Sequence, residues 1–153
     1  MTHERNEHGI EQLLDRLDGT GSDDEWSAAL ELRTRLGKDL PDLLLSRYRH
    51  AKKWATRSSC VYHAIRYAND SDAAVELALL AINDRAKVVR YRACMLVACS
   101  QRKDLLPRLR RLLTDVENDT KADLLAAIDA IESQNHNYFV DRDHSGMTTL
   151  TIR

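Results

Sequence analysis

Apolar residues recur every three or four positions through most of the chain, which is the spacing of one face of an α-helix. Polar breaks interrupt the pattern at "DGTGSDD", "GKD", "YANDSD", "INDRA", "SQRKD" and "DVENDT". These breaks are short, as connections between packed helices usually are. The pattern predicts an all-α fold of about eight helices.

Several short motifs predict where helices begin. The segments "SDDE" (residues 22–25) and "TKAD" (residues 120–123) each place a hydroxyl three residues before an acid. That arrangement satisfies free amide groups in a first helical turn. Pro41 and Pro107 lie near predicted helix starts, where a missing amide hydrogen costs little.

A shift of 33 residues aligns every second predicted helix. Positions that match under this shift are small or apolar, and they follow the spacing of one helix face. Three such columns are Ser27, Cys60, Ala93 and Ala126; Ala28, Val61, Cys94 and Ala127; and Leu32, Ile65, Ala98 and Ile131. The register predicts four helix pairs side by side, because no pair could bury its apolar face alone. A non-repetitive helical bundle remains the alternative.

One unit, "AAVELALLAINDRAKVVRYRACMLVACS" (residues 73–100), resembles HEAT and HEAT-like helical repeats. It has an Asn-Asp turn at residues 83–84, then Val-Arg at residues 89–90, then the small residue Ala93. The resemblance implies a right-handed α–α superhelix, a HEAT-like solenoid of about four helix pairs over residues 1–134.

The same resemblance implies internal contacts between turn acids such as Asp84 and the register-matched Arg57 and Arg90. Asp24 and Asp123 occupy the Arg90 position in the outer units. We therefore expect any ladder of Asp–Arg contacts to be broken at both ends, where capping units are often atypical.

In such stacks the second helices line the concave side, so their outward face is the candidate partner-binding surface. Trp, Tyr and Arg are the residue types that most often anchor protein interfaces. The candidate residues are Trp26, Arg33, Ser59, Tyr62, His63, Arg66, Arg92 and Met95. For the apolar residues Met95, Leu96 and Ile128 on the same face, we favour a core position over partner binding.

Charge comes in blocks, although the net charge is −1. Residues 47–67 hold six basic and no acidic side chains, and residues 85–111 hold nine basic and one acidic. Residues 1–46 and 112–153 are acidic. The basic bands contain aromatic residues, so they could follow a nucleic-acid backbone. Alternatively, opposite bands neutralise each other across neighbouring helices.

The sequence has no GxSxG, P-loop, GxGxxG or HExxH motif, and we assign no catalytic residue, metal or cofactor. In its size and in its alternating acidic and basic blocks, the chain is similar to small bacterial HEAT-like immunity proteins. That resemblance implies a non-enzymatic protein-binding module, an immunity protein that inhibits a bacterial toxin. The alternative is a nucleic-acid-binding HEAT-like protein. The oligomeric state stays open.

Residues 135–153 form a predicted C-terminal extension. Within it, "DRDHSG" (residues 141–146) matches the first half of an EF-hand calcium loop, but position twelve is Ile152 rather than Glu. The flanking "NYFV" and "MTTLTI" are aromatic and β-branched, so they predict a β-hairpin with a turn at "DRDHSG".

The apolar runs are too short to span a bilayer, and the first residues are polar. Three cysteines, an odd number, fit free buried thiols in a reducing compartment. We therefore expect a cytoplasmic protein without membrane contact.

Overall fold

The computed structural model describes residues 2–152, with side chains from residue 7 onward, and this part of the chain is all-α. The α-helices are α1 (Thr2–Asp15), α2 (Asp23–Leu36), α3 (Leu40–His50), α4 (Trp54–Ala64), α5 (Asp72–Ala81), α6 (Lys87–Ser100), α7 (Leu106–Leu112) and α8 (Asn118–Glu132). Short 3-10 helices are η1 (Gly37–Asp39), η2 (Ile65–Tyr67), η3 (Lys103–Leu105) and η4 (His136–Phe139). In the described part, no helix is both long and apolar enough to cross a membrane.

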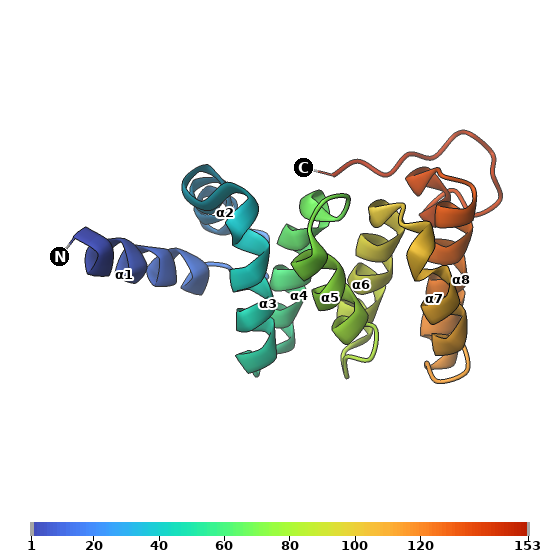
Figure 1. Ribbon diagram of the computed structural model, residues 1–153, viewed down its shortest axis with the longest axis horizontal. Coiled ribbons are helices and arrows are strands. Elements are labelled where there is room, and N and C mark those ends of the chain that lie inside the picture. Colours follow the sequence, from blue (N-terminus) through green and yellow to red (C-terminus); the bar gives the residue numbers. More distant parts are fainter. Residues whose placement is uncertain (1, 153) are drawn as a thin grey trace.

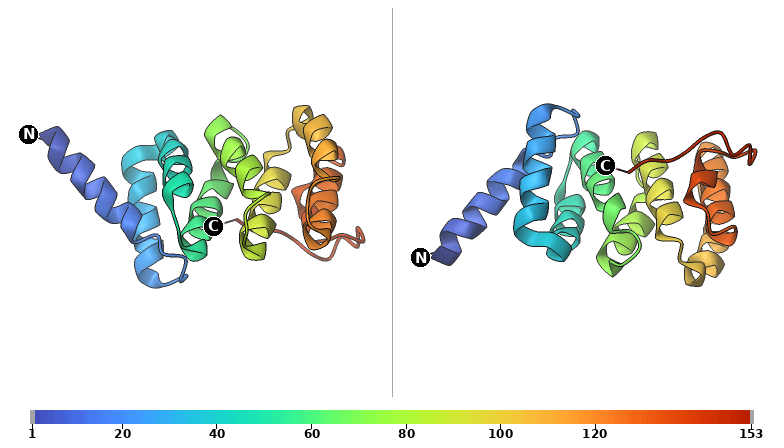
Figure 2. Two further views of the ribbon diagram at one scale, coloured as in Figure 1. Left: turned by 90° about the horizontal axis from the view of Figure 1, so that it is seen from below. Right: turned by 90° about the horizontal axis from the view of Figure 1, so that it is seen from above.

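Consecutive helices pack as pairs, and the pairs stand in a row (Figure 1). Helix α3 packs on α4, α5 on α6, and α7 on α8. Helices α3, α5 and α7 lie on one side of the row, and α4, α6 and α8 lie on the other (Figure 2). Contacts of α4 with α6, and of α6 with α8, join successive pairs along the second side.

The core follows the 33-residue register. One column of matching positions has no exposed surface at any member: Ala28, Val61, Cys94 and Ala127. A second column is at most 3% exposed: Leu32, Ile65, Ala98 and Ile131. In the third, Ser27 is exposed at the end of the row, whereas Cys60, Ala93 and Ala126 are buried. The second helices therefore turn the same face inward.

The C-terminal ends of α6 and α8 have the same backbone conformation and the same kind of capping bond, 33 residues apart. Gln101 and Gln134, 33 residues apart, both adopt left-handed backbone conformations with φ of 53° and 52°. Each side-chain amide donates to a carbonyl of its own helix, Gln101 to Ala98 at 2.8 Å and Gln134 to Ile131 at 2.6 Å. Gln134 also donates to the Gln101 carbonyl at 3.2 Å, which joins the ends of α6 and α8.

Predicted helix starts are confirmed in three of four places. The Ser22 hydroxyl caps α2 by accepting from the Glu25 amide at 3.2 Å. Pro41 and Pro107 lie in the first turns of α3 and α7. The prediction at Thr120 is wrong, because α8 begins two residues earlier and the Thr120 hydroxyl instead accepts from Arg90 Nε at 2.7 Å.

The predicted C-terminal β-hairpin is wrong, because residues 135–152 contain no strand. The Asp141 carboxylate accepts from the Ser145 amide at 3.1 Å and the Gly146 amide at 2.8 Å, which closes a turn. The Leu150 amide donates to the Asn137 side chain at 2.9 Å rather than to a partner strand. The tail then runs back along the α8–α6 side of the row (Figures 1 and 2).

A physical reason for this error lies at Phe139. Its ring is fully buried and packs against Tyr91, with ring centroids 5.4 Å apart. Residues 136–139 form η4, and in this conformation the Phe139 ring is buried, which is favourable for a large apolar side chain. Because these residues are not extended, they cannot pair with the tail as a strand. The domain boundary after residue 134 stays a prediction.

Candidate partner-binding cleft

Helix α1 departs from the row formed by the other helices (Figure 1). It packs on α2, and Leu13 of α1 and Leu17 of the loop after it are buried within the hydrophobic core. An ion pair of 3.0 Å between Asp15 and Arg47 Nη1 links the end of α1 to α3. The rest of α1 stands away from α3, and a cleft opens between them.

The loop before α2 holds α1 in place through a close backbone contact. Gly19 has a φ of +82°, and a Cβ added there would lie 2.2 Å from the Ala55 carbonyl oxygen at the start of α4. No other residue fits this position without displacing the backbone of α4 or of the loop. Gly19 thereby sets where α1 leaves the row.

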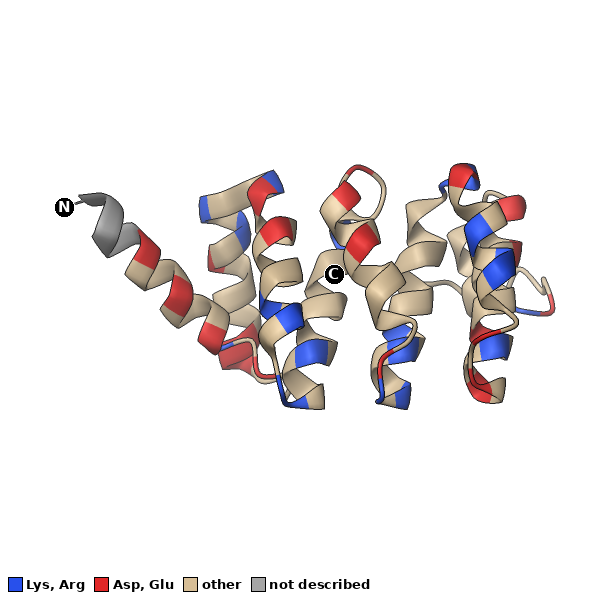
Figure 3. Cartoon of the chain, turned by 60° about the horizontal axis from the view of Figure 1, so that its bottom comes forward, with Lys and Arg blue, Asp and Glu red and all other residues tan. Residues whose placement is uncertain are grey.

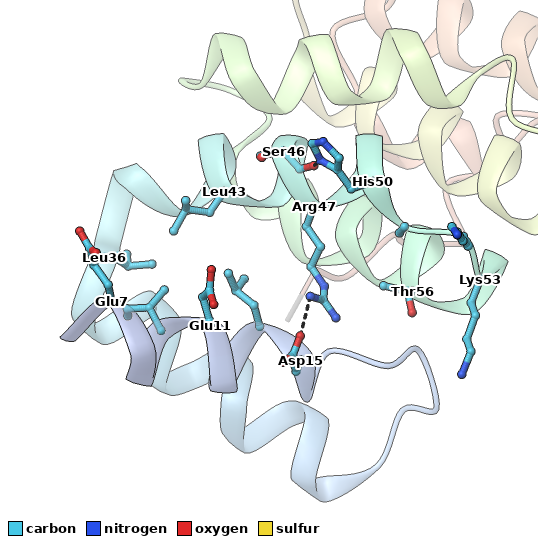
Figure 4. Close-up of a pocket in the computed structure, with 14 residues that line it drawn as sticks. Glu7, Glu11, Asp15, Leu36, Leu43, Ser46, Arg47, His50, Lys53 and Thr56 are labelled. Atoms are coloured by element: carbon cyan, nitrogen blue, oxygen red, sulfur yellow. Dashed lines mark hydrogen bonds and ion pairs between the residues drawn. The ribbon is translucent and has the colours of Figure 1, made fainter. Parts of the chain in front are cut away.

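The cleft has a volume of about 850 Å³ and lies between α1, the end of α2, α3 and the α3–α4 turn (Figure 4). This volume is within the range of small-molecule pockets. Four partly or largely buried apolar residues line it, and we call them the floor of the cleft: Ile10, Leu14, Leu36 and Leu43.

The two walls of the cleft carry opposite charge. The α1 wall presents three acids: Glu7, Glu11 and Asp15. The opposite wall presents basic side chains from α3 and the turn after it: Arg47, His50, Lys52 and Lys53. Arg47 Nε is buried without a hydrogen-bond partner among the described residues, although Nη1 of the same guanidinium binds Asp15.

Two of the predicted site residues, Ser59 and His63, are buried rather than exposed. Both bond to the same Glu25 oxygen, Oε2, at 2.8 Å. The other Glu25 oxygen accepts from the Gly21 amide at 2.9 Å. Sequence analysis missed Glu25 because it lies in the "SDDE" capping motif, where an acid is expected for local reasons. The sequence gives one other indication for Glu25: under the 33-residue shift it matches Ser58, a small residue, in the next unit.

The charge state of this cluster follows from its surroundings. Burial lowers the pKa of His63, against the opposing influence of Glu25. Burial acts to raise the pKa of Glu25, but hydrogen bonds from Gly21, His63 and Ser59 outweigh it and hold that pKa below its usual value. A neutral His63 therefore donates Nε2–H to a charged Glu25.

This cluster is not arranged for nucleophilic catalysis. In a Ser–His–acid triad the histidine lies between the hydroxyl and the acid, so that it can take the hydroxyl proton. Here Glu25 lies between Ser59 and His63, and the hydroxyl donates to the carboxylate. The arrangement joins α2 to α4.

Three more of the predicted residues, Trp26, Tyr62 and Arg92, also join helices to one another. Trp26, Tyr62 and His63 pack edge to face, with ring centroids 5.4–5.7 Å apart. The Arg92 guanidinium lies 4.8 Å from the centre of the Tyr62 ring and donates to the Ser58 hydroxyl at 2.8 Å. These contacts connect α2, α4 and α6 through side chains expected to contact a partner.

The remaining three predicted residues differ in their exposure. Arg66 is exposed, and Arg33 and Met95 are half-buried. Burial, and then the neighbouring charge of Arg66, lower the pKa of Arg33. Five of the eight candidates therefore join helices, and three of those five, Trp26, Tyr62 and Arg92, are half-buried like Arg33 and Met95.

The predicted contact between Arg57 and Asp84 is confirmed. Arg57 Nε donates to Asp84 Oδ2 at 2.8 Å and Nη2 donates to Oδ1 at 3.1 Å, and both side chains are buried. The Tyr48 hydroxyl adds a bond of 2.6 Å to Asp84. Arg90 donates to the Asp84 carbonyl at 2.8 Å, so the contacts continue to the next pair.

The interruption expected at the outer positions is also observed. Asp24 pairs with Arg16 at 2.9 Å, and Asp123 pairs with Arg142 at 2.9 Å. Both acids thus bind arginines outside the ladder. Arg90 itself uses Thr120 and lies 3.6 Å from Asp119 instead.

Much of the basic charge is balanced within the fold. Arg49 pairs with Glu76 at 2.7 Å, Arg110 with Glu132 at 2.8 Å, and Arg102 with Asp72 at 2.9 Å. Lys and Arg nevertheless gather near the ends of α3, α4 and α6 (Figure 3). Of the aromatic residues in the two basic bands, Trp54 is exposed, at 56%.

Among the described residues no group of three or more His, Cys, Asp or Glu side chains is placed to hold a metal ion. Comparisons of the chain found no matching family model, no matching curated protein and no matching solved structure. The resemblance to HEAT-like repeats therefore depends on the motif and register described above.

Proposed function

We propose that this chain is a non-enzymatic protein-binding module, a HEAT-like right-handed solenoid that binds its partner in the α1–α3 cleft. The observation that carries the proposal is the cleft itself, with an apolar floor between walls of opposite charge. An apolar centre inside a polar rim is the usual organisation of a protein interface.

The charge of the walls favours a protein over a nucleic acid as the occupant. A phosphate backbone would gain from Lys52 and Lys53 but would be repelled by Glu11 across the cleft. A polypeptide can supply both signs of charge and apolar side chains within one short segment.

The resemblance to small bacterial immunity proteins extends the proposal to a toxin as the partner. The inhibitor would act by occupying the surface that the toxin needs for its own activity. This step is supported by the resemblance, and a cytoplasmic location is supported by three unpaired, buried cysteines.

Nucleic-acid binding is the second candidate, and one observation favours it. The exposed Trp54 directly follows Lys52 and Lys53 at the basic end of α4. A gel shift with single-stranded DNA at physiological salt tests this candidate. Binding that is lost in Trp54→Ala would support it over the cleft proposal.

A matched pair of variants tests the leading proposal. Leu43→Arg places a charge on the cleft floor, whereas Leu125→Arg changes a leucine on α8 that is 50% exposed. Affinity purification from the source cells should yield a stoichiometric partner with wild type and Leu125→Arg but not with Leu43→Arg. Loss of the partner with Leu125→Arg alone would move the site to the second-helix face and refute the proposal.

A further inference from the structure

We propose that the cleft binds one amphipathic α-helix of the partner, with basic residues along its α1 flank and acidic residues along the opposite flank. This inference rests on the proposed function, because it names the kind of segment that the same cleft accepts. Three features of the structure support it.

The first feature is the departure of α1 from the layer that α3, α5 and α7 form on one side of the row. Helices α3 and α5 pack directly on each other, whereas α1 packs on α2 and leaves a wedge beside α3 (Figures 1 and 4). A helix laid in this wedge would contact α1 on one side and α3 on the other. It would complete the layer with the same helix-on-helix packing that the rest of the row uses.

The second feature is the volume. A helix is about 10 Å across with its side chains, so 850 Å³ encloses about two turns of one. On α1 the lining runs from Glu7 to Asp15, about 12 Å at the helical rise, so a bound helix would be held over about two turns, or roughly eight residues. That length is typical of helical segments that bind in grooves by apolar residues at positions i, i+3 or i+4, and i+7.

The third feature is the arrangement of charge. Glu7, Glu11 and Asp15 follow one another at four-residue intervals, so they form one acidic stripe along α1. Arg47 and Lys53 lie on the opposite wall (Figure 4). Asp15 and Arg47 pair with each other at one end of the cleft, so Glu11 and Lys53 are the charges on the two walls that a bound helix would meet. They favour opposite charges on the two flanks of that helix, which also fixes its direction along the cleft.

A second copy of this chain is a poor occupant by the same argument. Helix α1 of another copy would bring its own acidic stripe against Glu11 and Asp15. The Leu13 and Leu14 side chains of that helix are already buried within their own chain. The charge pattern therefore selects a different protein.

The proposal can be tested with a displayed peptide library that does not depend on knowing the partner. A library of random 18-residue peptides would be selected on the immobilised full-length chain and counter-selected on Leu43→Arg. Circular dichroism would verify that Leu43→Arg folds. It would also verify the folding of a control variant, Leu80→Arg, which changes an exposed leucine on α5. Selected peptides would then be titrated by fluorescence anisotropy.

We expect selected peptides to share an apolar stripe at helical spacing, with Lys or Arg on one flank and Asp or Glu on the other. Exchanging the two flanks at constant composition should weaken binding at least tenfold. Glu11→Lys combined with Lys53→Glu should reverse that preference, while Leu80→Arg should leave affinity unchanged.

Two results would overturn the inference in distinguishable ways. Selected peptides that depend on Leu43 but have no helical periodicity, or bind equally after flank exchange, would refute the helix while leaving protein binding in the cleft intact. If no peptide survives counter-selection on Leu43→Arg, and a co-purified partner is not affected by that variant, the proposed function fails as well.

Discussion

Replacement of Asp84 by alanine should be among the most destabilising single changes in the chain. The carboxylate accepts two bonds from Arg57, one from the Tyr48 hydroxyl at 2.6 Å, and one from the Ala86 amide at 2.9 Å. The variant would leave the Arg57 guanidinium buried and opposed only by main-chain carbonyls such as that of Lys52, at 2.7 Å.

The magnitude follows from the burial of both partners. Breaking a buried ion pair by removing one side costs about 3–5 kcal/mol, because an uncompensated charge remains. For a domain of this size each kcal/mol lowers the Tm by about 2–4 °C, so the expected fall in Tm is roughly 6–20 °C. Urea denaturation followed by circular dichroism would give the change in the free energy of unfolding.

A matched control is Glu76→Ala, which removes an ion pair between α3 and α5 whose side chains are about half exposed. Exposed pairs contribute less than about 1 kcal/mol, so this variant should unfold close to wild type. Equal destabilisation by Asp84→Ala and Glu76→Ala would refute the reasoning, since burial would then not decide the cost.

Three further predictions concern other parts of the fold. Gly19→Ala should lower the Tm more than Gly21→Ala in thermal melts, because both glycines have positive φ but a Cβ meets the Ala55 carbonyl only at Gly19; equal effects would argue against the close contact. Because the pKa of His63 is lower folded than unfolded, the unfolded chain binds more protons, and stability should fall as pH drops below about 6.5. His63→Gln should flatten that part of the urea-denaturation profile, and an unchanged slope would contradict the assignment. Burial raises the pKa of each cysteine thiol to about 12, so iodoacetamide at pH 8 should leave native protein unmodified and alkylate all three thiols in denaturant, as read by mass spectrometry; rapid native labelling would show that the row opens.

Sequence periodicity predicts the helices and their inward face because both depend on local spacing. Ala28 and Ala127 lie at opposite ends of the row, yet both are fully buried, as the 33-residue shift requires. The contact of Arg57 with Asp84 could be predicted for the same reason, since repeat register places an arginine against a turn acid.

Features that depend on how elements pack could not be read from the pattern. The "NYFV" segment has strand-like composition, but burial of Phe139 against Tyr91 decides its conformation. The cleft depends on the angle at which α1 leaves the row, and the loop after α1 approaches Ala55 closely at Gly19. Apolar spacing at Ile10 and Leu14 predicts a buried stripe but does not show that α3 stands away from it.

The predicted partner face illustrates the same limit. Trp, Tyr and Arg are common in interfaces, and the same residue types also fasten neighbouring helices. Tyr62 and Arg92 do the latter, since the guanidinium lies over the ring and bonds to the Ser58 hydroxyl. Composition alone does not distinguish a contact between helices from a contact with another protein.

Site-specific photo-crosslinking in the source cells tests the central claim, binding of a partner protein in the cleft, most directly. A benzophenone amino acid would replace Leu43 on the cleft floor or, separately, Leu125 on α8. The account predicts one discrete adduct from position 43, mapped by mass spectrometry to an amphipathic segment of another protein, and none from position 125. An adduct from position 125 with none from position 43 would contradict it.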